Sequence, residues 1–259
     1  MRTFFVCLWL AASGCQRDGD VQIEKKLDEI GKRLEEIDRK LAGGTAARMP
    51  ARPPGPDPKA VYAVPIEGSP FTGPAHAKVT LVEAYDFACP WCSRAQPVLA
   101  ALQKEYGSQL KIVYKQLVVH PQVATTPALA ACAAHLQGRF GEMYKLIWEK
   151  GFPTQKLGGA DMEALAAELK LDPTRFRADM NGARCRERLD RDAAELAQLG
   201  VHGTPGFFVN GRVVPGFVPI ETFRPLIDEE LKKADDALKT GTRLEAYYDS
   251  ILARGLKKL

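Results

Sequence analysis

The sequence predicts an α/β fold with an inserted helical domain, preceded by a coiled-coil helix. Apolar residues recur at alternating intervals of four and three along residues 23–41, which is the heptad pattern of a supercoiled helix. Apolar runs typical of strands occupy residues 61–64, 79–85, 111–119, 206–209 and 212–214. Residues from about 124–200, which separate these strands, are almost all helix-forming, so we expect them to form an insertion between strands of one sheet.

The composition is that of an ordinary globular protein. Of the 259 residues, 46% are hydrophobic and 26% are charged, which suffices for a substantial core. The net charge of +4 comes from interspersed acids and bases without a basic block, which argues against nucleic-acid binding. The four histidines are far apart in the sequence, and we predict neither a metal site nor a bound cofactor.

The chain begins with a candidate export signal. Arg2 precedes the apolar residues 4–12, a run too short for the roughly 20 residues of a membrane-spanning helix. Small residues then precede Cys15, which resembles a bacterial lipobox. We therefore expect a lipoprotein-type signal peptide at residues 1–14, lipid on Cys15 that holds the protein on a membrane surface, and location in the bacterial periplasm or cell envelope. A plain signal peptide is the alternative, because Ala12 stands where leucine is usual.

Residues 15–42 are predicted to form a coiled-coil stalk. Leucine occupies a positions and isoleucine d positions of the heptads, a combination that favours three or four strands. The g positions are basic and most e positions are acidic, so parallel chains can match them. We expect a homo-oligomer joined through residues 21–41; the alternative is one amphipathic helix that lies on the body or on lipid. Residues 43–59 are rich in glycine, alanine and proline and are predicted to form an extended linker.

The domain predicted at residues 60–235 is organised around Cys89-Pro90-Trp91-Cys92, which lies between an apolar strand and a helix-forming run. This spacing allows a disulfide within the first helical turn, whose N–H groups stabilise a thiolate at the first cysteine. Pro90 suits that turn because it has no N–H to leave unpaired. The alternative, a structural zinc site, needs four ligands, and the sequence has no second close cysteine or histidine pair. The motif therefore predicts a redox-active dithiol.

Two further features accompany the dithiol. Glu83 interrupts the strand that precedes Cys89. A carboxylate buried there can relay a proton to the inner sulfur, because burial raises its pKa toward neutrality; the alternative is an exposed acid on an alternating strand. Pro205 heads the strand at residues 206–209, where a cis bond would turn the backbone of Thr204 outward.

Four of the six cysteines already have a predicted role, because Cys7 belongs to the signal peptide, Cys15 carries the lipid, and Cys89 and Cys92 form the dithiol. The other two are Cys132 and Cys185. In an exported protein we expect a structural disulfide between them, and closing a loop of that length would stabilise the fold by about 4 kcal/mol. The alternative is two buried free thiols on separate helices. Residues 236–259 are predicted to form a C-terminal helical extension.

The chain resembles the DsbA-like branch of the thioredoxin superfamily in five features that occur in the family's order. They are the strand, the Cys-Pro-Trp-Cys motif, the helical insertion, the Gly-Val-His-Gly-Thr-Pro segment at residues 200–205, and the Asn210-Gly211 hairpin. The resemblance covers about residues 61–231. It implies a thioredoxin fold with a mixed sheet of four or five strands, and thiol-disulfide exchange on exported proteins.

The resemblance also implies roles for the residues that match its motifs. Cys89 is the exposed nucleophile, Cys92 is the buried resolving thiol, and Glu83 is the buried acid beneath them. Pro205 is the cis proline, and Thr204 before it offers backbone pairing to an extended substrate.

The sequence departs from the family pattern at Trp91, since the strongest oxidants of the family carry histidine before the second cysteine. We therefore expect a milder oxidant with a less acidic Cys89. Trp91 and Pro90 are expected to form part of an apolar peptide-binding rim, and His202 is expected to tune the nucleophile weakly.

These features predict an enzyme, namely an exported thiol-disulfide oxidoreductase that introduces disulfides into secreted or envelope proteins. Its partners would be unfolded or misoxidised exported proteins and a quinone-linked membrane protein that resets the dithiol. The stalk favours an alternative, an oligomeric disulfide isomerase or reductase. A second alternative is a non-catalytic, membrane-anchored binding module or chaperone whose dithiol is permanently bridged.

Overall fold

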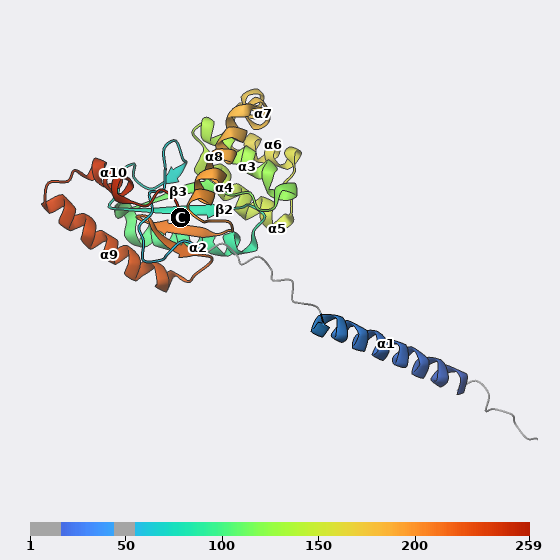
Figure 1. Ribbon diagram of the computed structural model, residues 1–259. Coiled ribbons are helices and arrows are strands. Elements are labelled where there is room, and N and C mark those ends of the chain that lie inside the picture. The colour runs from blue at the N-terminus through green and yellow to red at the C-terminus, as the bar shows by residue number, and fades with distance from the viewer. Residues whose placement is uncertain (1–16, 44–54) are drawn as a thin grey trace, which may run out of the picture. The chain divides into compact units, whose positions relative to one another are not determined.

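The computed structural model describes residues 17–43 and 55–259, which belong to two separate units. The first unit contains one helix, α1 (Arg17–Gly43), and the second, called the body, contains all the other elements (Figure 1). The predicted signal peptide, the predicted lipid site Cys15 and most of the predicted linker lie outside the described residues. In the described part of the chain, no helix is both long and apolar enough to cross a bilayer.

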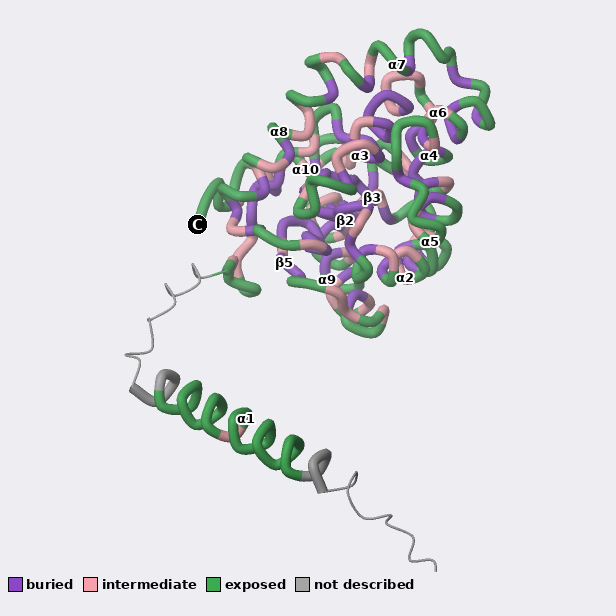
Figure 2. Tube along the Cα trace, turned by 90° about the vertical axis from the view of Figure 1, so that its right-hand side faces the viewer, coloured by how far each residue is buried: buried purple, intermediate pink, exposed green. Residues whose placement is uncertain are grey.

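Helix α1 carries the heptad segment, and its residues 21–39 are almost entirely exposed (Figure 2). The apolar stripe of α1 has relative exposures between 52% and 61% and consists of Ile23, Leu27, Ile30, Leu34 and Ile37. On the polar side, Arg33 pairs with Glu29 at 3.0 Å, the spacing of four residues expected on a helix. The predicted helix is therefore present, and self-association through the apolar stripe stays a prediction.

The body is built on a five-stranded mixed sheet with the strand order β1-β3-β2-β4-β5. The strands are β1 (Phe71–Thr72), β2 (Val79–Tyr85), β3 (Leu110–Gln116), β4 (Gly206–Val209) and β5 (Arg212–Pro215). Strand β2 pairs in parallel with β3, and the other neighbours are antiparallel. Every residue of β2 is buried, because this strand is central and both of its faces are covered.

The strand predictions need correction at two places. Within residues 61–64, Val61 and Tyr62 form isolated bridges rather than a strand, because the backbone of this segment pairs with Gly211 on one side and Leu256 on the other. Strand β3 ends before the predicted limit at residue 119, because the N–H of Val119 donates to the Asp86 carboxylate instead of to a neighbouring strand.

Helices cover both faces of the sheet (Figure 1). The helices of the body are α2 (Pro90–Tyr106), α3 (Pro121–Leu136), α4 (Phe140–Leu146), α5 (Phe152–Thr154), α6 (Gly159–Glu168), α7 (Pro173–Asn181), α8 (Ala183–Gln198), α9 (Ile220–Lys239) and α10 (Leu244–Arg254), with a 3-10 helix, η1 (Gly107–Gln109), and a π-helix, η2 (Ile147–Gly151). One face of the sheet packs through Leu81 against Leu102 of α2 and Phe223 of α9. The other face packs through Val82 against Leu196 of α8.

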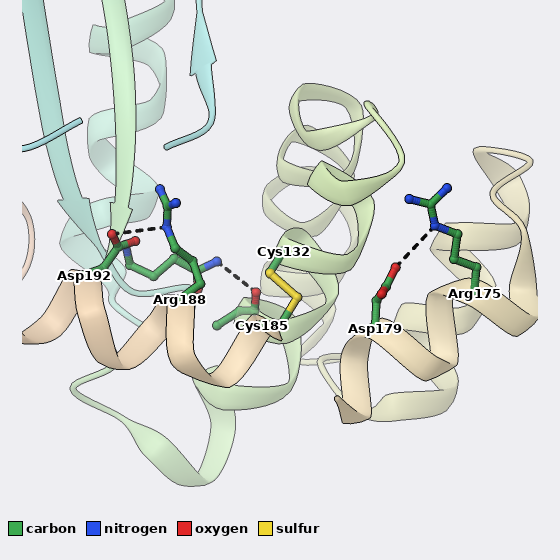
Figure 3. Close-up of a disulfide and its surroundings, with 8 residues drawn as sticks. Cys132, Arg175, Asp179, Cys185, Arg188 and Asp192 are labelled. Atoms are coloured by element: carbon green, nitrogen blue, oxygen red, sulfur yellow. Dashed lines mark hydrogen bonds and ion pairs between the residues drawn. A yellow bond between two sulfur atoms is a disulfide. The ribbon is translucent and has the colours of Figure 1, made fainter. Parts of the chain in front are cut away.

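Helices α3 to α8 form the insertion, close to the predicted boundaries. Cys132 on α3 and Cys185 on α8 are joined by a disulfide with a Cα–Cα distance of 5.7 Å (Figure 3). One turn further along α8, Arg188 pairs with Asp192 at 3.4 Å. Asp192 in turn accepts a hydrogen bond of 2.9 Å from the buried Lys115 on β3. The disulfide therefore joins α8 to α3 within the insertion, and the ion pair between Lys115 and Asp192 joins α8 to the sheet.

The C-terminal segment is part of the body. Helix α9 runs continuously across residue 236, where the extension was predicted to begin. Helix α10 buries Tyr247 and Ile251, and the N–H of Leu256 donates to the carbonyl of Val61 at 2.8 Å. The last helix thus covers the segment that the sequence predicts to be the first strand.

Candidate active site

The dithiol lies where β2 gives way to α2. Cys89 is the residue that precedes α2, and Pro90 opens the helix. The N–H of Cys89 donates to the carbonyl of Asp86 at 3.0 Å, which closes a turn directly before the helix. Cys89 and Cys92 are both free thiols. The backbone N–H groups of the first helical turn therefore point at the first sulfur.

Cys89 has its Sγ against the segment that contains Pro205. As a thiol, Cys89 donates to the carbonyl oxygen of Thr204 at 3.4 Å, and the peptide bond between Thr204 and Pro205 is cis. The predicted exposed nucleophile is only 4% exposed, because this segment lies against it. The structure thus brings together the two motifs that are more than 100 residues apart in the sequence.

The pKa values of the two sulfurs are shifted in opposite directions. The pKa of Cys89 is lowered to about 5, and the largest cause is a hydrogen bond from the Cys92 side chain. Burial acts in the opposite direction and raises this pKa. Hydrogen bonds from Thr204 and from the N–H groups of Trp91 and Cys92 lower it further. Burial raises the pKa of Cys92 well above its usual range, and the hydrogen bond to Cys89 and the charge of Glu83 add to this. Cys89 is thus the sulfur that ionises at neutral pH, while Cys92 keeps its proton.

Glu83 on β2 is fully buried, so the alternative of an exposed acid does not apply. Burial raises the pKa of Glu83 to about 8, although hydrogen bonds from Tyr144 and Gln96 lower it. The Tyr144 hydroxyl donates to Oε2 at 2.8 Å, and Gln96 Nε2 donates to Oε1 at 3.4 Å. A carboxyl with this pKa can exchange a proton near neutral pH, and its charge acts on Cys92.

The predicted substrate-binding residues Trp91, Pro90 and His202 are all exposed. Trp91 is 50% exposed; its ring lies 5.9 Å from that of Phe217 and beneath the guanidinium of Arg94 at 4.6 Å. This aromatic pair and the exposed Pro90 lie beside the nucleophile, and their role as a peptide-binding rim stays a prediction. His202 is exposed in the loop before Thr204 and is not among the main groups that shift the pKa of Cys89.

Sequence reasoning missed Asp86, which lies in the loop before the dithiol. Its buried carboxylate accepts hydrogen bonds from the N–H groups of Ala88 (2.6 Å), Val119 (2.7 Å) and His120 (2.8 Å). It therefore fastens the loop that carries Cys89 to the loop after β3. The bond to Ala88 is an Asx turn, which is a local signal in the sequence; the other two bonds are long-range.

Sequence reasoning also missed both partners of Glu83. Gln96 lies one helical turn after Cys92 and also donates to its carbonyl at 2.9 Å, so helix periodicity could have placed it beside the dithiol. Tyr144 comes from α4 in the insertion. No local pattern connects it with β2.

Comparisons with known proteins agree with this geometry. The family model of the DSBA-like thioredoxin domain matches residues 80–228, more than half of the chain. A thioredoxin-like oxidoreductase from Silicibacter pomeroyi DSS-3 aligns with a TM-score of 0.58 and 27% identity over 63% of this chain and 92% of that chain. BdbD from Bacillus subtilis aligns with a TM-score of 0.61 and 22% identity over 67% of this chain and 98% of that chain, which supports the fold alone.

Several proteins named as Na(+)/H(+) antiporters also match part of this chain. The Na(+)/H(+) antiporter NhaA of Herminiimonas arsenicoxydans is 32% identical over 173 residues, and NhaA 3 of Salinispora tropica is 44% identical over 146 residues. The matches cover 67% and 54% of this chain but only 26% and 21% of those relatives. The chain spans about a quarter of the length of these proteins, and their named transport activity is not carried over to it.

Proposed function

Because the chain belongs to the DSBA-like thioredoxin family, and is thus a thiol-disulfide oxidoreductase by class, we propose that it introduces disulfides into secreted or envelope proteins through Cys89 and Cys92. One observation carries the proposal. Two free thiols in one helical turn have opposite pKa shifts, and the acidic one lies against the carbonyl of Thr204. That arrangement provides one attacking and one resolving sulfur.

In the oxidising direction, a substrate thiolate attacks Cys89 of the disulfide form. A bond forms between the substrate sulfur and Cys89, the bond between Cys89 and Cys92 breaks, and Cys92 leaves as a thiolate that takes a proton from the Glu83 carboxyl. A second substrate thiolate then attacks the substrate sulfur of the mixed disulfide. The substrate leaves with a new disulfide, Cys89 leaves as a thiolate, and the dithiol has gained two electrons.

The cis peptide segment supports an extended substrate in this scheme. Thr204 has its carbonyl 3.4 Å from the Cys89 sulfur, so a substrate strand that pairs with this backbone brings its own sulfur to the nucleophile. The Trp91–Phe217 pair offers apolar contact next to it. We propose unfolded or misoxidised exported proteins as substrates.

Location and reoxidation belong to the same proposal. The lipobox-like residues before Cys15 support lipid attachment in the periplasm or cell envelope. A thioredoxin-like protein from Salmonella enterica serovar Typhimurium, similar in fold, is described as periplasmic. A quinone-linked membrane protein would accept the two electrons from Cys89 and Cys92 and restore the disulfide.

A disulfide isomerase is the second candidate, and the apolar stripe of α1 favours it. Lys26 and Arg33 stand at g positions, whereas Glu24 and Asp38 stand at e positions. Antiparallel helices would face g against g and bring like charges together, so the charges favour parallel association. Parallel stalks would hold several dithiols at the same end of an oligomer, where they can act on one misoxidised chain.

The two candidates are separated by the refolding of ribonuclease. An oxidase forms disulfides rapidly in the reduced substrate, whereas an isomerase restores activity to the scrambled one. Cys89→Ser abolishes both activities, and Cys92→Ser accumulates a mixed disulfide with substrate, because the resolving thiol is absent. Turnover by Cys89→Ser at the wild-type rate would refute the proposed function. Sedimentation of the full chain and of a chain without residues 16–42 tests the stalk: a monomer in both cases rules it out.

A further inference from the structure

The buried Glu83 carboxyl is held by residues from two parts of the body. Tyr144 comes from α4 of the helical insertion and donates to one oxygen at 2.8 Å. Gln96 comes from α2 and donates to the other at 3.4 Å, while it also donates to the carbonyl of Cys92 at 2.9 Å. The insertion and the dithiol helix therefore meet at this carboxyl.

A cleft of about 490 Å³ reaches these same two side chains. It is bounded by α2, by the edge of the sheet and by α4 with η2, and its lining includes Gln96, Ala100, Tyr114, Gly141, Tyr144 and Trp148. Glu83 itself has no exposed surface. Each of its carboxyl oxygens is thus separated from the cleft by one hydrogen-bonded side chain.

We propose that this cleft is the route by which Glu83 exchanges its proton with solvent, and that Tyr144 is the positioning residue that holds the carboxyl at the inner end of the route. The inference rests on the proposed function, because only an exchanging dithiol requires Glu83 to give up or regain a proton in each cycle. In the resolving direction, Cys92 transfers its proton to Glu83 and attacks Cys89 of a mixed disulfide. The bond between Cys89 and Cys92 forms, the bond from Cys89 to the bound thiol breaks, and that thiol leaves as an anion.

The titratable groups that face Glu83 come from its own strand and from β3, α2 and α4. They are Tyr85 on its own strand, Tyr114 on β3, Cys89 and Cys92 at the start of α2, and Tyr144 on α4. The cationic Lys115 of β3 binds Asp192 and Glu195 of α8, which pack on the opposite face of the sheet. Of the three tyrosines, Tyr144 is the one that hydrogen-bonds Glu83; the hydroxyl of Tyr114 pairs with Thr72 at 3.0 Å.

A two-phase reaction with Ellman's reagent tests the role of Tyr144. The full chain with Cys7→Ser and Cys15→Ser first forms a mixed disulfide on Cys89, which releases one coloured thiolate. Attack by Cys92 then releases the second. We expect the second phase to accelerate as Glu83 loses its proton, and the pH midpoint of this phase to rise by about one unit in Tyr144→Phe, because a donor to the carboxylate is removed.

Tyr114→Phe is the matched control, since it removes a hydroxyl from the same cleft that bonds to Thr72 and makes no hydrogen bond to Glu83. It should leave the midpoint of the second phase unchanged, and the midpoint of the first phase should be similar in all three proteins. Equal shifts in Tyr144→Phe and Tyr114→Phe, or no shift in either, would overturn the role of Tyr144. Absence of the second phase in the parent chain would instead refute the proposed function itself.

The route is tested by deuterium exchange of the protonated carboxyl, followed by its infrared band, which Glu83→Gln identifies. An added Cβ at Gly141, on the wall of the cleft, or at Gly159, at the start of α6 and away from it, meets no atom within 4 Å. We expect Gly141→Leu to slow the exchange and Gly159→Leu to leave it at the wild-type rate. Exchange at one rate in all three proteins would overturn the route. Tyr144→Phe should in addition move the carboxyl band, since one hydrogen bond is lost.

Discussion

Glu83 and Cys89 should impose opposite pH dependences on stability. Burial raises the pKa of Glu83 from 4.5 to about 8, so between these values the folded protein holds a proton that the unfolded chain has lost. The contribution of Glu83 to the stability of the fold is therefore present at low pH and is lost as the pH rises from 4.5 to about 8. The pKa of Cys89 falls from 9.0 to about 5, chiefly through the Cys92 hydrogen bond. Its contribution is present at high pH and is lost as the pH falls.

The two effects overlap between about pH 5 and 8 and oppose each other there. Each fully shifted group changes the free energy of unfolding by at most about 1.4 kcal/mol per pH unit. Removing either group should therefore unmask the slope of the other.

Urea unfolding in the Cys92→Ser background measures this directly. The active-site disulfide cannot form there, and serine keeps a hydrogen-bond donor beside Cys89. Relative to Cys92→Ser alone, stability should rise with pH when Glu83→Gln is added and fall with pH when Cys89→Ala is added. Groups common to all three proteins cancel in this comparison. Slopes of the same sign in the two double variants would refute the assigned ionisation states.

Three further predictions concern the dithiol, the disulfide and the loop before the dithiol. Cys92→Ala should raise the pKa of Cys89 by about one unit relative to Cys92→Ser, because a donor to the thiolate is lost; ultraviolet titration of the thiolate measures it. Replacing Cys132 and Cys185 by alanine opens a loop of sequence separation 53 and should cost about 4 kcal/mol in urea unfolding. Asp86→Ala should cost at least about 2 kcal/mol, since buried N–H groups lose their acceptor, and Asp86→Asn should cost less; thermal unfolding compares them.

The parts of the site that rest on local patterns could be predicted from the sequence. Two cysteines at a strand-to-helix junction define the dithiol, and the alternation of β2 turns Glu83 toward the same face as Leu81 and Tyr85. Proline directly before a strand marks the other side of the site. These signals work because each depends on residues within one turn or one strand.

The missing parts depend on contacts between distant segments. Strand β1 has two residues, too few for any periodicity, and it exists because β3 offers it a free edge. The apolar residues 61–64 have the composition of a strand, yet their hydrogen bonds go partly to the C-terminal segment. Tyr144 reaches Glu83 across a sequence separation of 61. A pattern within a single element carries no information on such partners.

The acidity of Cys89 bears on the direction of electron flow. The pKa of Cys89, about 5, lies between those of the corresponding cysteines in thioredoxin, about 7, and in DsbA, about 3.5. The reduction potentials of these two proteins are about −270 mV for thioredoxin and about −120 mV for DsbA. The interactions that stabilise the thiolate also stabilise the reduced dithiol, so they raise its potential. A dithiol between these limits can be reset by either an oxidising or a reducing partner. We therefore expect the direction of electron flow to depend on the redox partner of Cys89, and on whether association through the apolar stripe of α1 presents several dithiols to one substrate.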